Sequence, residues 1–135
     1  KTVNRYTSEG RAEIHKNLGI NTDTMIWLMQ NPVLDKTIEF ADNRISLFAA
    51  QYGRCAVTGI DLMPHDIRCH HKVPLENGGT DEYGNLVLVT EAVHILIHAT
   101  LGETIQKYLN ELQLNKKQLE KLNRLRKLAG TSVIA

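Results

Sequence analysis

Apolar residues recur at three- and four-residue spacing in several parts of the chain, a pattern typical of amphipathic α-helices. The predicted helices cover residues 8–18, 22–30, 42–52, 91–99, 103–113 and 115–128. In the last two helices, leucines recur at positions that we expect to be buried. These are Leu109, Leu112, Leu119, Leu122, Leu125 and Leu128.

The middle of the chain has a different residue pattern, with short extended segments between turn-forming residues. CAVT (55–58) and DIRCHH (66–71) are short extended candidates, and we expect them to form a hairpin because the segment between them contains turn-forming Gly and Pro. ENGGTDEYGN (76–85) is loop by composition. LVLV then leads to Thr90, a good N-cap for the next helix. The whole pattern predicts an α+β fold.

Length and composition place the chain among ordinary globular proteins. Its 135 residues suit one domain, and its apolar and charged fractions of 42% and 23% argue against wholesale disorder. No apolar run approaches the ~20 residues of a membrane span. Two cysteines, Cys55 and Cys69, are too few for a disulfide scaffold, so we expect a reducing compartment, the bacterial cytoplasm or an organellar matrix. The chain does not begin with Met, and we expect it to be part of a longer protein.

The formal net charge of +1 conceals an uneven distribution. From Asn115 onward there are six basic residues and one acidic residue, Glu120. A basic C-terminal helix on a mildly acidic body suits contact with nucleic-acid phosphates. The alternative is a solvated helix face with no partner.

Four of the six histidines lie within residues 69–98. His94 and His98 are one helical turn apart, so they share a face and can converge on one metal ion. His70 and His71 are consecutive in a predicted strand, so their side chains point to opposite faces and only one can join the helix pair. The doublet therefore offers one ligand and one base. By themselves, two histidines four residues apart are more often incidental.

The motifs GRCAVTG (53–59), HHKVP (70–74), GGTDEYGNL (78–86) and HILIH (94–98) resemble those of the HNH endonuclease superfamily. The resemblance implies a ββα-metal (His-Me finger) core, in which a β-hairpin and a helix surround one metal ion, with flanking N- and C-terminal helices.

The resemblance also implies a role for each histidine. His70 matches the metal-binding residue that directly precedes the catalytic histidine, and His71 matches that histidine, the general base. Asn85 matches the family's central Asn, which holds the loop that positions the base. His94 matches the second metal residue, and His98 matches an additional ligand of His-rich, colicin-like members.

NRISLFAAQYGRCAVTG (43–59) and LNRLRKLAG (122–130) are similar to the C-terminal endonuclease region of group II intron-encoded reverse transcriptase/maturases. In that family, a flank like YTSEGRAEIH (6–15) belongs to the preceding DNA-binding stretch. The implied parts are an N-terminal helical flank over 1–42, a nuclease core over 43–101 and a C-terminal helical extension, packed on the core, over 102–135.

The implied activity is metal-dependent hydrolysis of a DNA phosphodiester, which leaves a 3′-hydroxyl to prime reverse transcription of the intron. The implied partners are double-stranded DNA, the reverse transcriptase/maturase part of the same polypeptide and the group II intron RNA. We expect activity to fall at acid pH, because a protonated imidazole neither binds metal nor accepts a proton. The expected nucleic-acid contacts are Lys72, Lys116, Lys117 and Lys121.

Two features leave alternatives open. Three imidazoles favour Zn²⁺, Ni²⁺ or Mn²⁺, whereas the family generally works with Mg²⁺ or Mn²⁺. Cys55 and Cys69 each stand alone, without the paired cysteines that form a zinc knuckle in many relatives, and we expect them to be small buried apolar residues. A colicin- or phage-like HNH nuclease, or a non-enzymatic zinc-stabilised nucleic-acid-binding module, would share the histidines.

Overall fold

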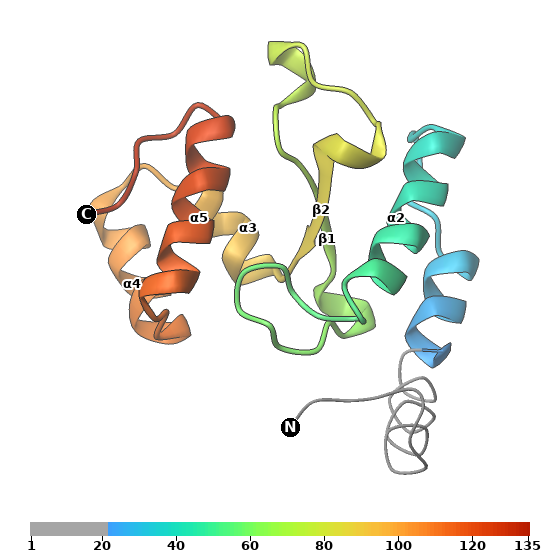
Figure 1. Ribbon diagram of the computed structural model, residues 1–135, viewed down its shortest axis with the longest axis horizontal. Coiled ribbons are helices and arrows are strands. Elements are labelled where there is room, and N and C mark those ends of the chain that lie inside the picture. Colours follow the sequence, from blue (N-terminus) through green and yellow to red (C-terminus); the bar gives the residue numbers. More distant parts are fainter. Residues whose placement is uncertain (1–21) are drawn as a thin grey trace.

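A two-stranded antiparallel hairpin lies at the centre of the computed structural model, which describes residues 22–135 (Figure 1). Its strands are β1 (Arg68–His71) and β2 (Leu86–Val89). The paired residues are Arg68 with Val89, Cys69 with Leu88, His70 with Val87 and His71 with Leu86. The described helices are a segment over 22–30, α2 (Ile38–Ala50), α3 (Glu91–His98), α4 (Gly102–Leu112) and α5 (Lys116–Leu128). The fold is α+β, with the hairpin packed against helices. The helix predicted over 8–18 lies outside the described residues.

The hairpin predicted between residues 55–58 and 66–71 is wrong. Residues 56–58 form a turn, and their contact with the sheet includes one backbone hydrogen bond, from Ala56 N to Leu88 O at 3.1 Å. The partner of β1 is instead β2, reached across residues 72–85. Leu86, Leu88 and Val89 of β2 are at most 1% exposed, and Cys55 and Val57 of the other segment are buried as well. Both segments therefore contribute to the core, but only β2 pairs with β1.

The two faces of the hairpin meet different helices. α2 packs against β2 on one side, and α3 lies against β1 on the other (Figure 1). Because side chains alternate along a strand, His71 faces α2, where its ring stacks on Phe40, and His70 faces α3. The opposite orientation expected for the two adjacent histidines is therefore observed.

Local capping fixes where the site-bearing helices begin. Thr90 caps α3 as predicted, and its side chain accepts a hydrogen bond from Val93 N. Thr37, rather than Asp42, caps α2 by accepting from Phe40 N, so this helix begins four residues before the predicted start. Asn115 and Gln118 form a capping box at the start of α5.

The C-terminal helices pack on the α3 side of the hairpin. Leu122 and Leu125 are buried, whereas Leu128 is 48% exposed, so its predicted burial is wrong. Arg126 is also buried, and its guanidinium donates to Leu96 O, to Ala99 O at 2.9 Å and to Ser132 O at 2.7 Å. The bonds to Leu96 and Ala99 tie α5 to the end of α3. No helix within residues 22–135 has the length and apolar character needed to cross a membrane.

Candidate metal centre and the adjoining His71 pocket

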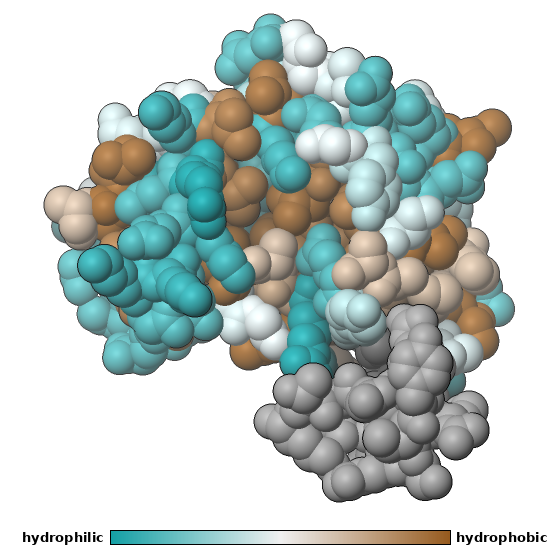
Figure 2. Space-filling view, viewed as in Figure 1, coloured by the Kyte–Doolittle hydropathy of each residue, from teal (hydrophilic) through white to brown (hydrophobic). Residues whose placement is uncertain are grey.

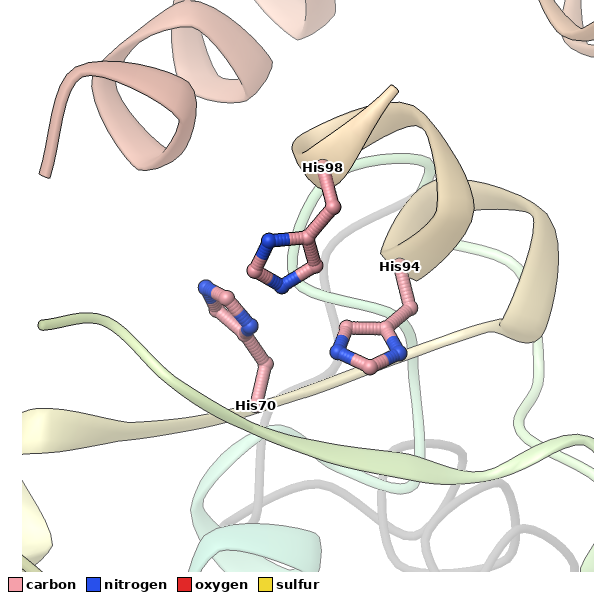
Figure 3. Close-up of side chains that lie close together, drawn as sticks. All are labelled: His70, His94 and His98. Atoms are coloured by element: carbon pink, nitrogen blue, oxygen red, sulfur yellow. The ribbon is translucent and has the colours of Figure 1, made fainter. Parts of the chain in front are cut away.

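His70 from β1 and His94 and His98 from α3 form a compact triad (Figure 3). The centroids of their rings are 5.0 to 5.2 Å apart, and one nitrogen of each ring lies within 4.8 Å of the others. The single turn between His94 and His98 places both on the α3 face that meets β1. The three residues can hold one metal ion.

The state of His70 fits this use. Its side chain is buried, and its Nε2 has no hydrogen-bond partner among the described residues. A buried polar atom without a partner costs about 1–3 kcal/mol, a cost that a metal bond at this nitrogen would remove. Burial, and then His94 and His98, lower the pKa of His70 to about 3. The ring is therefore neutral at physiological pH, as a metal ligand must be.

The two other rings are also held in the neutral form. Burial, followed by the charge of His98, lowers the pKa of His94 to about 4. Burial also lowers the pKa of His98, although Glu76 opposes this shift. Three neutral imidazoles form a donor set suited to borderline divalent ions such as Zn²⁺ or Ni²⁺.

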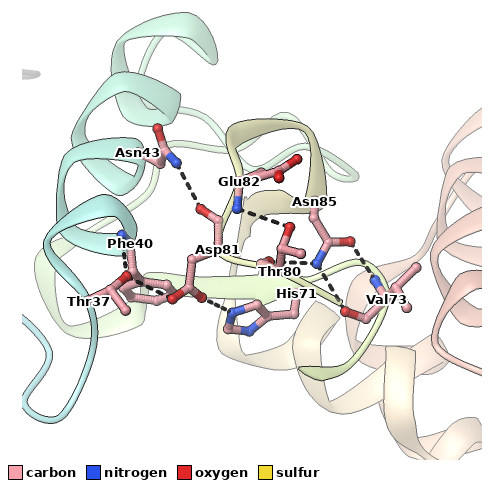
Figure 4. A network of polar contacts seen from close by, with 9 residues as sticks. All are labelled: Thr37, Phe40, Asn43, His71, Val73, Thr80, Asp81, Glu82 and Asn85. Atoms are coloured by element: carbon pink, nitrogen blue, oxygen red, sulfur yellow. Dashed lines mark hydrogen bonds and ion pairs between the residues drawn. The ribbon is translucent and has the colours of Figure 1, made fainter. Parts of the chain in front are cut away.

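His71 lies outside the triad, in a pocket between β1, α2 and the Gly-rich loop formed by residues 76–85 (Figure 4). Its ring stacks on Phe40 with centroids 5.5 Å apart and planes 26° apart. Its Nε2 is 2.7 Å from Oδ1 of Asp81. The side chain keeps 15% of its surface exposed, so the pocket holds the ring without sealing it from solvent.

Asn85 closes the loop between the two strands. Its Oδ1 accepts from Val73 N at 2.9 Å, and its Nδ2 donates to Val73 O at 3.0 Å and to Thr80 O at 2.8 Å (Figure 4). Gly79 also lies against this turn, where an added Cβ would be 1.8 Å from Val73 O. Only glycine fits this position. The side chain of Asn85 thus joins Val73 to Thr80 across the loop.

Asp81 is a site residue that the sequence analysis missed. Its Oδ2 accepts from Thr37 Oγ1 at 2.7 Å, and its backbone O accepts from Asn43 Nδ2 at 2.8 Å. The hydrogen bond with His71, followed by that with Thr37, lowers the pKa of Asp81. The only sequence signal for this role was an Asp in a Gly-rich loop, and an Asp in that position is equally typical of a turn-forming residue.

The expected nucleic-acid contacts separate into two groups. Lys72 and Lys121 line a hollow of about 260 Å³. Arg124, which the sequence analysis did not single out, also lines it. Apolar residues from the 55–58 turn, β2 and α5 also line it, and apolar surface is visible between the hydrophilic surface of α5 and the hairpin (Figure 2). Lys116 and Lys117 are exposed at the start of α5 and do not line the hollow.

Both cysteines are free, with Cys55 buried and Cys69 partly buried. Burial raises the pKa of the Cys69 thiol to about 12, so this side chain is an unreactive thiol at neutral pH. Cys55 is therefore a small buried residue, as expected, whereas Cys69 is buried only in part.

Neither a scan against protein-family models nor a search of curated proteins finds a match to this chain.

Proposed function

We propose that this protein is a metal-dependent DNA endonuclease built on a ββα-metal unit of the HNH type, formed by β1, β2 and α3. One observation carries the proposal: the adjacent histidines His70 and His71 have separate environments. His70 is buried within a triad of possible ligands, whereas His71 is partly exposed and bonded to a carboxylate. A purely structural metal site needs the first arrangement but has no use for the second.

The side chains of the chain suit phosphodiester hydrolysis. Asp81 engages Nε2 of His71, so Nδ1 is the ring atom available to take a proton from the attacking water. Asn85 holds the loop that carries Asp81. Lys72, Lys121 and Arg124, the basic residues that line the hollow, would attract the phosphates that flank the scissile bond.

His70, His94 and His98 would hold one divalent ion. When bound, that ion would neutralise charge on the scissile phosphate and on the departing 3′ oxygen. The imidazoles suit Zn²⁺ or Ni²⁺, while the HNH family generally works with Mg²⁺ or Mn²⁺. The structure favours the first pair because all three donors are nitrogens.

The sequence resemblance extends the proposal to group II intron mobility. In that setting, residues 1–42 end a DNA-binding region, residues 43–101 form the nuclease and residues 102–135 extend it. The cut supplies a 3′-hydroxyl primer to the reverse transcriptase/maturase of the same polypeptide, which acts with the intron RNA in the bacterial cytoplasm or organellar matrix. A colicin- or phage-like nuclease would use the same site without these partners.

The all-imidazole triad also favours a second function, a zinc-stabilised nucleic-acid-binding module without catalysis. Supercoiled plasmid separates the two. The nuclease proposal predicts nicking that EDTA abolishes and that added Mn²⁺, Mg²⁺, Ni²⁺ or Zn²⁺ restores, with a 5′-phosphate and a 3′-hydroxyl at the nick. His65→Ala, which removes an exposed histidine outside the site, should nick at the parent rate. DNA binding without nicking under every metal condition would favour the binding module.

A further inference from the structure

The environment of Asp81 is more elaborate than a surface loop requires. Its two carboxylate oxygens bond to different elements, Oδ1 to His71 of β1 and Oδ2 to Thr37 at the start of α2. Its backbone oxygen accepts from Asn43, six residues further along the chain in α2. The side chain is only 13% exposed. Three hydrogen bonds, two at the carboxylate and one at the backbone oxygen, thus fix this residue relative to both β1 and α2 (Figure 4).

The donor and acceptor groups of each side chain determine the direction of each hydrogen bond. An ionised carboxylate only accepts, so the hydroxyl of Thr37 donates to Oδ2 while its oxygen accepts from Phe40 N at 2.9 Å. By the same rule, His71 must donate through an Nε2–H to Oδ1. A neutral imidazole that carries its hydrogen on Nε2 has an unprotonated Nδ1.

We propose that Asp81 is the positioning residue of His71, holding the ring in the Nε2–H tautomer so that Nδ1 is the proton acceptor. This inference rests on the proposed nuclease function. Stacking on Phe40 fixes the plane of the ring, and the bond to Asp81 fixes its rotation within that plane. Two constraints from separate elements leave the base a single orientation.

The arrangement makes α2 part of the catalytic apparatus. Thr37 is both the N-cap of α2 and the donor to Asp81, and Phe40 in the first turn carries the stacking ring. The start of α2 therefore sets the position of the base, although it contributes no atom to the reaction.

Asp81→Asn is the informative variant. The amide is nearly isosteric with the carboxylate, but its NH₂ group can donate to Nε2, which moves the ring hydrogen to Nδ1. A similar change at a carboxylate–histidine pair in a serine protease keeps the geometry and lowers the rate by supporting the wrong tautomer. Glu82→Gln is the matched control, because it removes the same charge from an exposed neighbour in the same loop.

The experiment combines ring ¹⁵N NMR of the 135-residue chain above neutral pH, in EDTA, with single-turnover nicking of supercoiled DNA under saturating metal. The parent and Glu82→Gln should show His71 protonated at Nε2. Asp81→Asn should show protonation at Nδ1 and nick about 100-fold more slowly or worse, with DNA affinity unchanged.

A parent spectrum with the His71 hydrogen on Nδ1 would overturn the inference. This measurement uses only the parent protein, so it does not depend on whether a variant folds. Nicking by folded Asp81→Asn at the parent rate would also overturn it. The tautomer change without any nicking by the parent would defeat the proposed nuclease function while leaving the placement of the ring by Asp81 established.

Discussion

Acidification should destabilise the metal-free protein well above the pH at which carboxylates titrate, because His70 is buried in its neutral form. Burial is the largest cause of its pKa falling from 6.5 to about 3, followed by His94 and His98. In the unfolded chain the ring regains an ordinary pKa of about 6.5. The unfolded state therefore binds a proton that the folded state refuses, and the free energy of unfolding falls as the pH drops from about 6.5 toward 3.

The expected loss is large for a domain of this size. Each pH unit below 6.5 costs about 1.4 kcal/mol, so His70 alone removes about 2 kcal/mol between pH 7 and pH 5. The lowered pKa of His94 acts in the same direction over the same range. The pKa of Asp81 is lowered from that of an ordinary carboxyl, so its contribution is lost only below a pH of about 4. Total stabilities of small domains are about 5–15 kcal/mol.

Urea denaturation in EDTA at pH 7 and pH 5 measures the effect. The parent should lose about 2 kcal/mol or more of its free energy of unfolding. His70→Gln should lose about 2 kcal/mol less than the parent over the same interval, and His65→Gln, which changes an exposed ring, should match the parent. Equal losses in the parent and His70→Gln would refute the reasoning, as would a parent whose stability does not fall.

Three further predictions address the metal, the loop and the basic residues of the hollow. The pKa values of all three ligands lie below that of an ordinary imidazole, so protons compete little with metal near neutrality. Zn²⁺ affinity measured by competitive titration should therefore fall less than about fourfold from pH 7.5 to 6.0, whereas three ordinary imidazoles would lose about fiftyfold. Gly79→Ala should destabilise the fold by about 3 kcal/mol or more in urea denaturation, because its Cβ would strike Val73 O. Gly84→Ala, whose Cβ meets nothing within 4 Å, should cost less than about 1 kcal/mol, and equal costs would contradict the prediction. Arg124→Gln should weaken DNA binding at every sequence and reduce the slope of log affinity against log salt by about 1. Lys127→Gln, which removes an exposed charge of α5 outside the hollow, should change both the affinity and the slope less. Equal effects of the two variants would show that the hollow does not contact DNA.

The helical part of the fold could be predicted because its signals are local. The start of α3 follows from Thr90, and α4 and α5 begin and end within one residue of the predicted bounds. α2 was predicted to begin at residue 42 because Asp42 is itself a good cap, whereas the structure uses Thr37. A cap is chosen by what the helix packs against, and here Thr37 also bonds to Asp81.

The hairpin could not be assigned by local pattern. CAVT (55–58) and LVLV (86–89) are both short apolar runs beside turn formers, and nothing in their composition ranks one above the other as the partner of β1. Both segments also place residues in the core, so the choice of β2 as the partner of β1 is determined only in the assembled fold.

The site shows the same division. Strand alternation and helix pitch predicted that only one of His70 and His71 could join His94 and His98, because both rules concern residues in one element. The resemblance to HNH nucleases indicated His70, and His70 is the one that lies in the triad. Asp81 was missed because its role depends on a contact between elements, the bond to His71 ten residues away. Arg124 was missed because the hollow that it lines with Lys72 is formed by separate parts of the chain.

The central claim is that two adjacent histidines divide the work, with His70 serving the metal and His71 the proton transfer. The most direct test compares His71→Ala with His70→Ala in metal binding by calorimetry and in metal-dependent nicking of supercoiled plasmid. The account predicts that His71→Ala binds metal as the parent does and nicks about 100-fold more slowly or worse, while His70→Ala loses metal affinity and activity together. His71→Ala that nicks as fast as the parent would contradict the account.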